Sequence, residues 1–134
     1  MTPELIIASF LSDSTISAIV DDRIACAQLP KESNFPAIVY NVIDTIPEAH
    51  VNFREAQIAR ARVQITAIAT TIAEMKSIHA AIRTLMDFQH QVTHGGYLVV
   101  SSRFAIMTQV EKDNEAGLWF QSADYIIRYY ETTP

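Results

Sequence analysis

A change of hydrophobic period in the middle of the chain constrains its fold more than any other feature. Over residues 60–67, polar and apolar side chains alternate, which is the pattern of a β-strand with one face toward solvent. From Thr71 to Leu85, apolar residues instead recur at spacings of three and four, which is typical of a helix with one apolar stripe. Thr71 and Glu74 have the spacing of a capping box, which starts such a helix. The sequence therefore predicts a strand followed almost directly by a helix that needs a surface to cover.

The N-terminal segment predicts a helix. Thr2-Pro3-Glu4 combines a capping residue, a proline suited to the first turn and an acid that complements the helix dipole. Residues 12–15 are poor helix formers, so the pattern leaves open whether the segment is one helix or two short ones. Asp21-Asp22 is predicted to end it.

Two strands are predicted next, at residues 23–27 and 35–43, with a polar turn at residues 31–34 between them. The second strand is dense in β-branched and aromatic side chains, and Pro36 is placed at its beginning, where a missing N–H matters least. Residues 44–54 show no clear period. They are predicted to be a connecting loop that orders against a partner.

The C-terminal third predicts a hairpin. After a polar stretch and a break at Gly95-Gly96, residues 97–100 are expected to form a minor strand. Residues 103–110 and 118–130 are expected to form long strands joined by the charged turn 111–117. In the last strand neither side is cleanly polar, so one side is expected to be covered by helices and the other by something else.

The order of these elements predicts an α+β fold, with an antiparallel or mixed sheet of about four to five strands and two main helices packed on one face. A chain of 134 residues with 49% hydrophobic content can bury one core, so residues 1–134 are expected to form a single domain. No apolar run reaches the roughly 18 residues that cross a bilayer, and no signal peptide is evident. A soluble, unexported protein is therefore expected.

Charge and cysteine content narrow the functional classes. Ten basic and fifteen acidic residues give a formal charge of −5, and the basic residues are scattered along the sequence, which disfavours tight binding to a phosphate backbone. The balance remains compatible with DNA passing by or with protein partners. Cys26 is the single cysteine, so an internal disulfide is impossible, and we expect it to be a small buried apolar residue.

The four histidines do not predict a metal site. His90 and His94 have a spacing that would place two imidazoles on one helical face, but the intervening residues and the following glycine pair disfavour a helix. His79 is expected at the boundary of the apolar stripe, and His50 falls in the predicted loop. No metal ligand is assigned.

The remaining polar residues carry no catalytic signature. Three glycines are too few for a phosphate-binding loop, no serine lies in a nucleophile-elbow motif, and Cys26 has no assignable base. Asp21 and Asp22 are expected to face solvent. The acids of the last turn have the wrong spacing for a calcium loop: Glu111, Asp113 and Glu115.

The aromatic residues near the C-terminus are expected in core packing or a protein interface. They are Trp119, Phe120, Tyr125, Tyr129 and Tyr130. With no catalytic, cofactor-binding or metal residue assigned, a structural or binding role without enzymatic activity is expected.

Over nearly its whole length the sequence resembles the phage tail-completion proteins, which include tail terminators and tail-to-head joining proteins of long-tailed bacteriophages and prophages. The resemblance rests on DDRIACAQLP, FPAIVYNVIDTIPE, RARVQITAIATTIAEMKSIHAAIRTLM and EKDNEAGLWFQSADYIIRYYE. In this family the middle strand reads arginine, valine and glutamine before alternating apolar residues and an alanine-rich helix, which Arg62-Val63-Gln64 and residues 71–86 match. Residues 87–100 are longer than the family pattern.

The resemblance implies a homo-oligomeric ring, commonly a hexamer, at the head-proximal end of the tail tube in the virion, made in the cytoplasm of the bacterial host. Such a ring ends tail growth and offers a docking surface to the head connector or neck protein. Its implied partners are further copies of itself, the tail tube protein, the connector, and DNA that crosses the channel without sequence-specific binding, with no membrane. An acidic balance suits such a channel. Terminator and joining protein are not distinguished.

Two other classes remain open. A small α+β ligand-binding or regulatory domain without catalysis would need a pocket with converging polar groups. An enzyme would need at least two polar residues brought together by the fold, and a buried His79 beside a carboxylate would favour it.

Overall fold

The computed structural model describes residues 2–30, 34–47 and 58–131. The described residues form a seven-stranded mixed sheet and the helices α1 Thr2–Leu11, α2 Ser14–Val20 and α3 Ile72–Met86. The strands are β1 Ile24–Cys26, β2 Ala37–Pro47, β3 Ile58–Ala69, β4 Gln89–His94, β5 Tyr97–Met107, β6 Glu111–Asp113 and β7 Leu118–Tyr130. The α+β class is confirmed, but the sheet is larger than the expected four to five strands, and a third helix is present.

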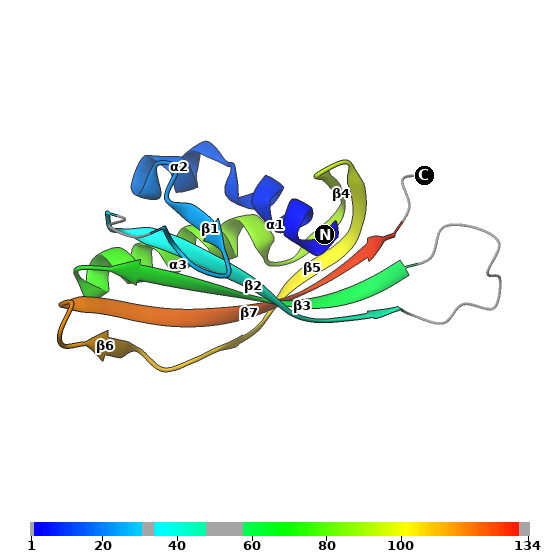
Figure 1. The fold of residues 1–134 in the computed structure, drawn as a ribbon. Coiled ribbons are helices and arrows are strands. Elements are labelled where there is room, and N and C mark those ends of the chain that lie inside the picture. The colour runs from blue at the N-terminus through cyan, green and yellow to red at the C-terminus, as the bar shows by residue number, and fades with distance from the viewer. Residues whose placement is uncertain (1, 31–33, 48–57, 132–134) are drawn as a thin grey trace.

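The sheet is antiparallel except at one edge. Its strand order is β1-β2-β3-β7-β5-β4, with β6 beside β7, and only β1 and β2 run parallel. All three helices lie on the same side of the sheet (Figure 1). The sheet therefore has one covered face and one face that no described helix covers.

The N-terminal segment forms two helices. Asp13 breaks it, because its carboxylate accepts a hydrogen bond of 2.9 Å from the Thr15 N–H and caps α2. Asp21 ends α2 with a positive φ of 57°. Among the described residues, no single helix has the length and apolar character needed to cross a membrane; α1 and α2 meet that criterion only as a pair bent by 81°.

Helix α3 begins as its sequence predicts. Thr71 caps it by accepting a 3.2 Å hydrogen bond from the Glu74 N–H. The apolar stripe lies against the sheet, although its first member, Ile72, is 41% exposed and lies outside the core. Met75, Ile78 and Ile82 are fully buried, whereas Leu85 is only partly buried and Met86, outside the predicted stripe, is fully buried instead.

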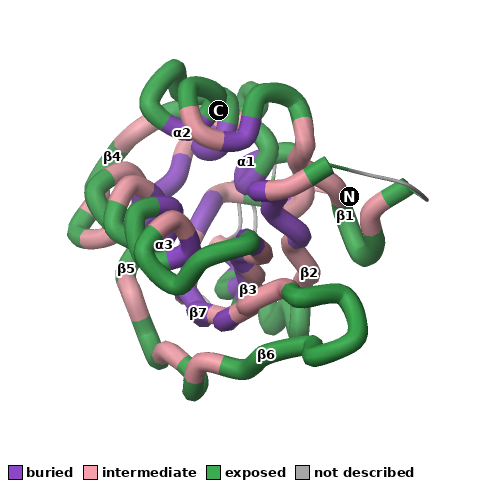
Figure 2. Tube along the Cα trace, turned by 90° about the vertical axis from the view of Figure 1, so that its left-hand side faces the viewer, coloured by how far each residue is buried: buried purple, intermediate pink, exposed green. Residues whose placement is uncertain are grey.

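Strands β3 and β7 form the middle of the sheet. They pair antiparallel from Ile58 opposite Tyr130 to Ala69 opposite Trp119. Along both strands every second residue is buried beneath the helices. Figure 2 looks along the strands and shows the buried purple segments gathered where the sheet faces the helices. On β3 the buried residues are Val63, Ile65 and four alanines: Ala59, Ala61, Ala67 and Ala69. The small alanine side chains allow α3 to approach the sheet closely.

The region after α3 differs from its prediction. Residues 89–94 form the edge strand β4 rather than a polar loop, and β5 is one continuous strand rather than a minor strand and a separate long one. Gly95 and Gly96 form the turn between them, both with positive φ. A Cβ on Gly95 would lie 2.8 Å from the carbonyl oxygen of Leu5 in α1, so this turn fits against the helix only as glycine.

Strand β2 is longer than predicted. It continues to Pro47, through the start of the predicted loop, and its register shifts between Val42 and Asp44. This irregularity interrupts the alternation, so the sequence shows no period there. The rest of that loop, with His50, and the turn at 31–33 lie outside the described residues.

Two smaller expectations also change. The charged turn 111–117 contains the short strand β6, which pairs with the beginning of β7. Cys26 is an exposed free thiol in β1, not a buried apolar residue, because β1 forms an edge of the sheet.

Candidate functional site: the open face of the sheet

The side of the sheet opposite the helices, which we call the open face, displays the second set of alternating side chains of β2, β3, β5 and β7. Residues directly opposite each other in neighbouring strands point to the same side. The pairing of Asp44 with Arg62, and of Arg62 with Ile126, therefore places all three on this face.

Four arginines gather at one end of the open face, and we call them the arginine patch: Arg60, Arg62, Arg103 and Arg128. Ile126 has Arg62 opposite it on β3 and Arg103 opposite it on β5. Two residues further along β7, Arg128 has Arg60 opposite it. Neighbouring strands lie about 4.8 Å apart, so the four side chains project from one compact area.

One arginine of the patch is held by an ion pair. Arg62 Nε lies 2.7 Å and Arg62 Nη2 lies 2.5 Å from Asp124 Oδ2. Asp124 is only 4% exposed, and its other oxygen, Oδ1, has no hydrogen-bond partner. The Arg62 side chain is 46% exposed, so it covers the carboxylate and still reaches solvent.

Apolar side chains surround the arginine patch. Ile46 and Ile106 are 45% and 51% exposed, and Ile126 and Tyr130 are partly exposed. Among the described residues, no lysine or glutamate lies between or directly beside these four arginines on the open face. Arginine and large apolar side chains are enriched in protein interfaces, where lysine and glutamate are depleted.

The covered face holds the histidine that could have indicated an enzyme. His79 is 3% exposed rather than at a boundary, and its Nε2 lies 2.8 Å from the carbonyl oxygen of Gln121 on β7. Burial lowers the pKa of His79, and nearby Lys76 lowers it further. The neutral ring therefore donates from Nε2 to Gln121, which ties α3 to the sheet; none of the interactions described for His79 involves a carboxylate.

His94 packs β4 against α1. His94 stacks on Phe10 with ring centroids 3.8 Å apart, and its Nδ1 lies 2.9 Å from Ser9 Oγ. Burial lowers the pKa of His94. His90 is exposed on the same strand. In the ranges that the structure describes, no group of three or more His, Cys, Asp or Glu could hold a metal ion.

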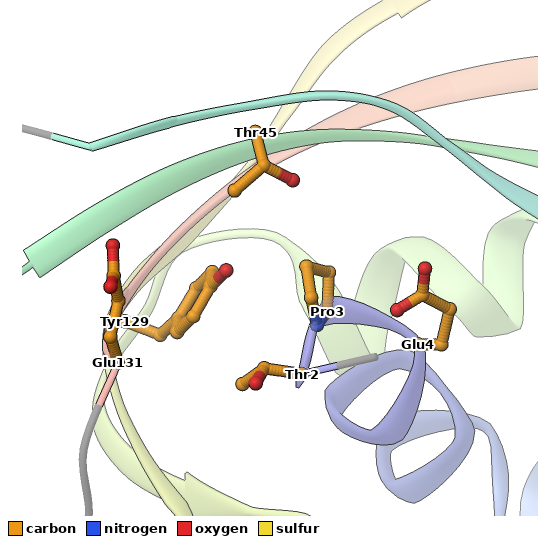
Figure 3. Close-up of a pocket in the computed structure, with 6 residues that line it drawn as sticks. All are labelled: Thr2, Pro3, Glu4, Thr45, Tyr129 and Glu131. Carbon is orange, nitrogen blue, oxygen red and sulfur yellow. The ribbon is translucent and has the colours of Figure 1, made fainter.

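Two surface hollows lie beside α1. The first, of about 380 Å³, lies where β2 and the end of β7 face the start of α1, and Figure 3 shows its lining residues Thr2, Pro3, Glu4, Thr45, Tyr129 and Glu131. Burial raises the pKa of Tyr129 to about 12, and Glu131 and Glu4 add to this effect, so the hydroxyl stays protonated. The second, of about 470 Å³, is lined by Ser9, Phe10, Ser12, Asp13, Leu85, Gln89, Thr93 and His94.

The remaining candidates from the sequence lie apart from one another. Asp21 and Asp22 are exposed at the end of α2. Asp113 accepts backbone hydrogen bonds within the exposed hairpin turn and, with its neighbouring acids, forms a turn as expected. Of the aromatic residues, Tyr125 and Tyr129 are in the core, Trp119 packs against it, and Phe120 and Tyr130 lie on the open face.

Sequence reasoning missed the arginine patch. The basic residues are scattered along the chain, but strand register brings those of β3, β5 and β7 together. The signal was present in the alternation, since Arg60 and Arg62 share the polar side of β3 and Arg128 falls on one side of β7. What the sequence lacked was the order of the strands.

Solved structures show the same fold. One chain from the virion of a native gene transfer agent particle superimposes with a TM-score of 0.68 at 13% sequence identity, covering 95% of this chain and 92% of that chain. A second solved chain superimposes with a TM-score of 0.59 at 14% identity, covering 100% of this chain and 99% of that one. No curated protein sequence matches.

The fold and its exposed faces define an α+β domain whose most distinctive feature is a surface rather than a reactive cleft. Residues 4–130 match the family described as Tail completion protein gp17, which is nearly the whole chain. The chain belongs to this family, as the resemblance in its sequence indicated, and is a structural protein of a phage-type tail.

Proposed function

We propose that this protein caps the head-proximal end of a phage tail tube as an oligomeric ring, ends tail growth and provides the docking surface for the head connector. The observation that carries the proposal is the family match over residues 4–130. The protein acts in the virion, after synthesis in the cytoplasm of the bacterial host, and its partners are further copies of itself, the tail tube protein and the connector. DNA crosses the channel without sequence-specific contacts, and the protein catalyses no reaction.

The surfaces of the molecule support an assembly role. A ring requires two different patches on each copy, one for each neighbour. The open face and the helical side are two such patches on opposite sides of one sheet (Figure 1). Ile46, Ile106 and Leu5 expose apolar surface that an assembly would cover.

Deletion of the gene from its phage or prophage tests the role in the particle. We expect tails of irregular length that fail to join filled heads, and normal particles when the gene is restored on a plasmid. Electron microscopy measures tail length and head attachment. Tails of normal length joined to filled heads in the deletion strain would contradict the proposal.

Native mass spectrometry tests the ring. We expect a closed oligomer, most simply a hexamer, whose fraction rises with protein concentration. The same measurement on tails purified from particles detects rings that form only on the tube. A chain that stays monomeric in solution and is missing from purified tails would contradict a ring.

A further inference from the structure

One end of the open face and the N-terminal helices carry opposite charge. The arginine patch and the two aspartates beside it, Asp44 and Asp124, give the patch a formal charge of +2 in a chain whose formal charge is −5. On the opposite side of the sheet, residues 2–22, which comprise α1, α2 and the turn after them, contain no lysine or arginine. We call this segment the acidic layer, and its acids are Glu4, Asp13, Asp21 and Asp22.

Two charges of the patch are not neutralised by the described residues. Arg60 and Arg103 are exposed, and neither forms an ion pair with a residue that the structure describes. A negative surface placed on the open face would neutralise Arg60 and Arg103.

The dimensions of the two surfaces also agree. Arg60 and Arg103 lie two strands and two residues apart, which corresponds to about 12 Å. In the acidic layer, exposed Asp13 precedes α2 and exposed Asp21 and Asp22 follow it, at the two ends of a helix about 10 Å long. The exposed side chains between them are small, which permits close approach: Ser14, Thr15, Ser17 and Ala18.

We propose that the arginine patch of one copy docks on the acidic layer of the next copy, so that these two surfaces form the repeated interface of the ring. The inference rests on the proposed function and names the two faces that the ring requires. Contacts between different patches of identical copies generate closed rings when the rotation between copies closes.

A second copy fits the patch better than nucleic acid does. Ile126 lies between the arginines of the patch, and Asp44 and Asp124 lie beside them; an acid next to a phosphate backbone opposes binding. Further along the same side, about 20 Å away, β6 adds Glu111 opposite Phe120. A protein surface that is acidic, flat and partly apolar matches this mixture.

The experiment uses two full-length variants with reversed charge on one surface each. The first, Arg60→Glu with Arg103→Glu, makes the patch acidic without touching the Arg62–Asp124 pair. The second, Ser17→Lys with Ala18→Lys and Asp22→Lys, changes the formal charge of the exposed positions of the acidic layer from −3 to +1. Circular dichroism and thermal melting establish that both variants are folded.

In a ring made of either variant alone, the patch of one copy and the layer of the next carry charge of the same sign. We therefore expect the self-association of each variant to be weaker than that of the wild type by roughly 100-fold or more. An equimolar mixture restores two complementary interfaces, and rings should return with alternating copies. An alternating ring closes only with an even number of subunits, as a hexamer has. Native mass spectrometry resolves the mixed composition.

The matched control is Glu111→Lys with Glu115→Lys, which changes the charge by the same +4 as the second variant but in the exposed segment of β6 and the turn after it. Mixed with the first variant, it should not restore rings. Rings formed by the first variant alone, or a failure of the two interface variants to assemble together while the wild type forms rings, would overturn this interface and leave the proposed ring intact. A wild type without rings counts against the ring itself.

Binding of double-stranded DNA tests the other possible partner of the arginine patch, which is nucleic acid. We expect the first variant to lose assembly while filter retention of DNA at moderate salt stays at the wild-type level. Unchanged assembly with a loss of DNA retention would make the patch a nucleic-acid surface and overturn the proposal.

Discussion

The two faces of β3 and β7 are built from neighbouring residues of the same strands, yet they differ in what their side chains contact. On the covered face, Ala61, Val63 and Tyr125 are fully buried under the helices. On the open face, Arg62 and Ile126 lie next in sequence and reach solvent. The comparison teaches that one strand can supply stability through one face and leave the other free for recognition, because its side chains alternate.

The largest difference between the faces should come from removing apolar volume. Ile82→Ala leaves a cavity under α3, where Ile82 is fully buried, and should lower the free energy of unfolding by about 2–5 kcal/mol. Ile106→Ala on the open face, where the side chain is 51% exposed, is the control and should cost less than about 1 kcal/mol. Urea denaturation measures both, and equal losses would mean that the open face is covered within the monomer.

Breaking the ion pair of the open face should have a smaller effect. Arg62→Met leaves the buried carboxylate of Asp124 without its charged partner, and we expect a loss of about 1–3 kcal/mol. The double variant Arg62→Met with Asp124→Asn should recover part of this loss, because the buried charge is removed as well. A single variant as stable as the wild type would show that Arg62 does not stabilise Asp124.

A buried histidine on the covered face should make the free energy of unfolding depend on pH. Burial lowers the pKa of His79 in the folded state below its ordinary value of about 6.5, so protonation favours the unfolded chain. Stability is therefore lost as pH falls below about 6.5. In His79→Gln the difference in Tm between about pH 7.5 and about pH 5 should narrow by roughly 3 °C.

His94, whose pKa burial also lowers, contributes to the remaining acid sensitivity. His90→Gln removes an exposed histidine from β4 and is the control for a lost surface imidazole. An acid sensitivity in His79→Gln equal to that of the wild type would contradict a buried neutral ring.

The smallest effect is expected at Tyr125. Its hydroxyl is buried without a hydrogen-bond partner, and burial raises its pKa to about 12. Tyr125→Phe should therefore change the free energy of unfolding by less than about 0.5 kcal/mol or increase it. Tyr125→Ala should cost about 3–5 kcal/mol, because the ring fills the core. A large loss in Tyr125→Phe would reveal a partner for the hydroxyl.

Sequence patterns predicted the fold best where one face is polar and the period is regular. The alternation at 60–67 and the stripe after Thr71 predicted β3 and α3 with their boundaries nearly correct, because local periodicity and capping determine both. The same reasoning missed β4, whose residues Gln89–His94 are mostly polar because it is an edge strand. It also missed the end of β2, where the register shift after Val42 removes the period.

The candidate site could not be predicted for a different reason. Arg60, Arg103 and Arg128 are far apart in sequence and come together only through the order in which β3, β7 and β5 pair. The alternation shows which side of a strand each arginine occupies, but not which strands are neighbours. The burial of His79 was missed because it follows from the packing of α3 on the sheet, where Nε2 meets the Gln121 carbonyl oxygen of β7.

The turn at Gly95 ties the start of the chain to its second half. Its α-carbon faces the Leu5 carbonyl with no room for a methyl group, whereas an added methyl group on Gly117, also at positive φ in the β6–β7 turn, would meet nothing within 4 Å beyond its chain neighbours. Saturation mutagenesis should find position 95 the more intolerant of the two. Because the contact is so close, a shift of the start of α1 toward this turn has to displace the β4–β5 hairpin as well.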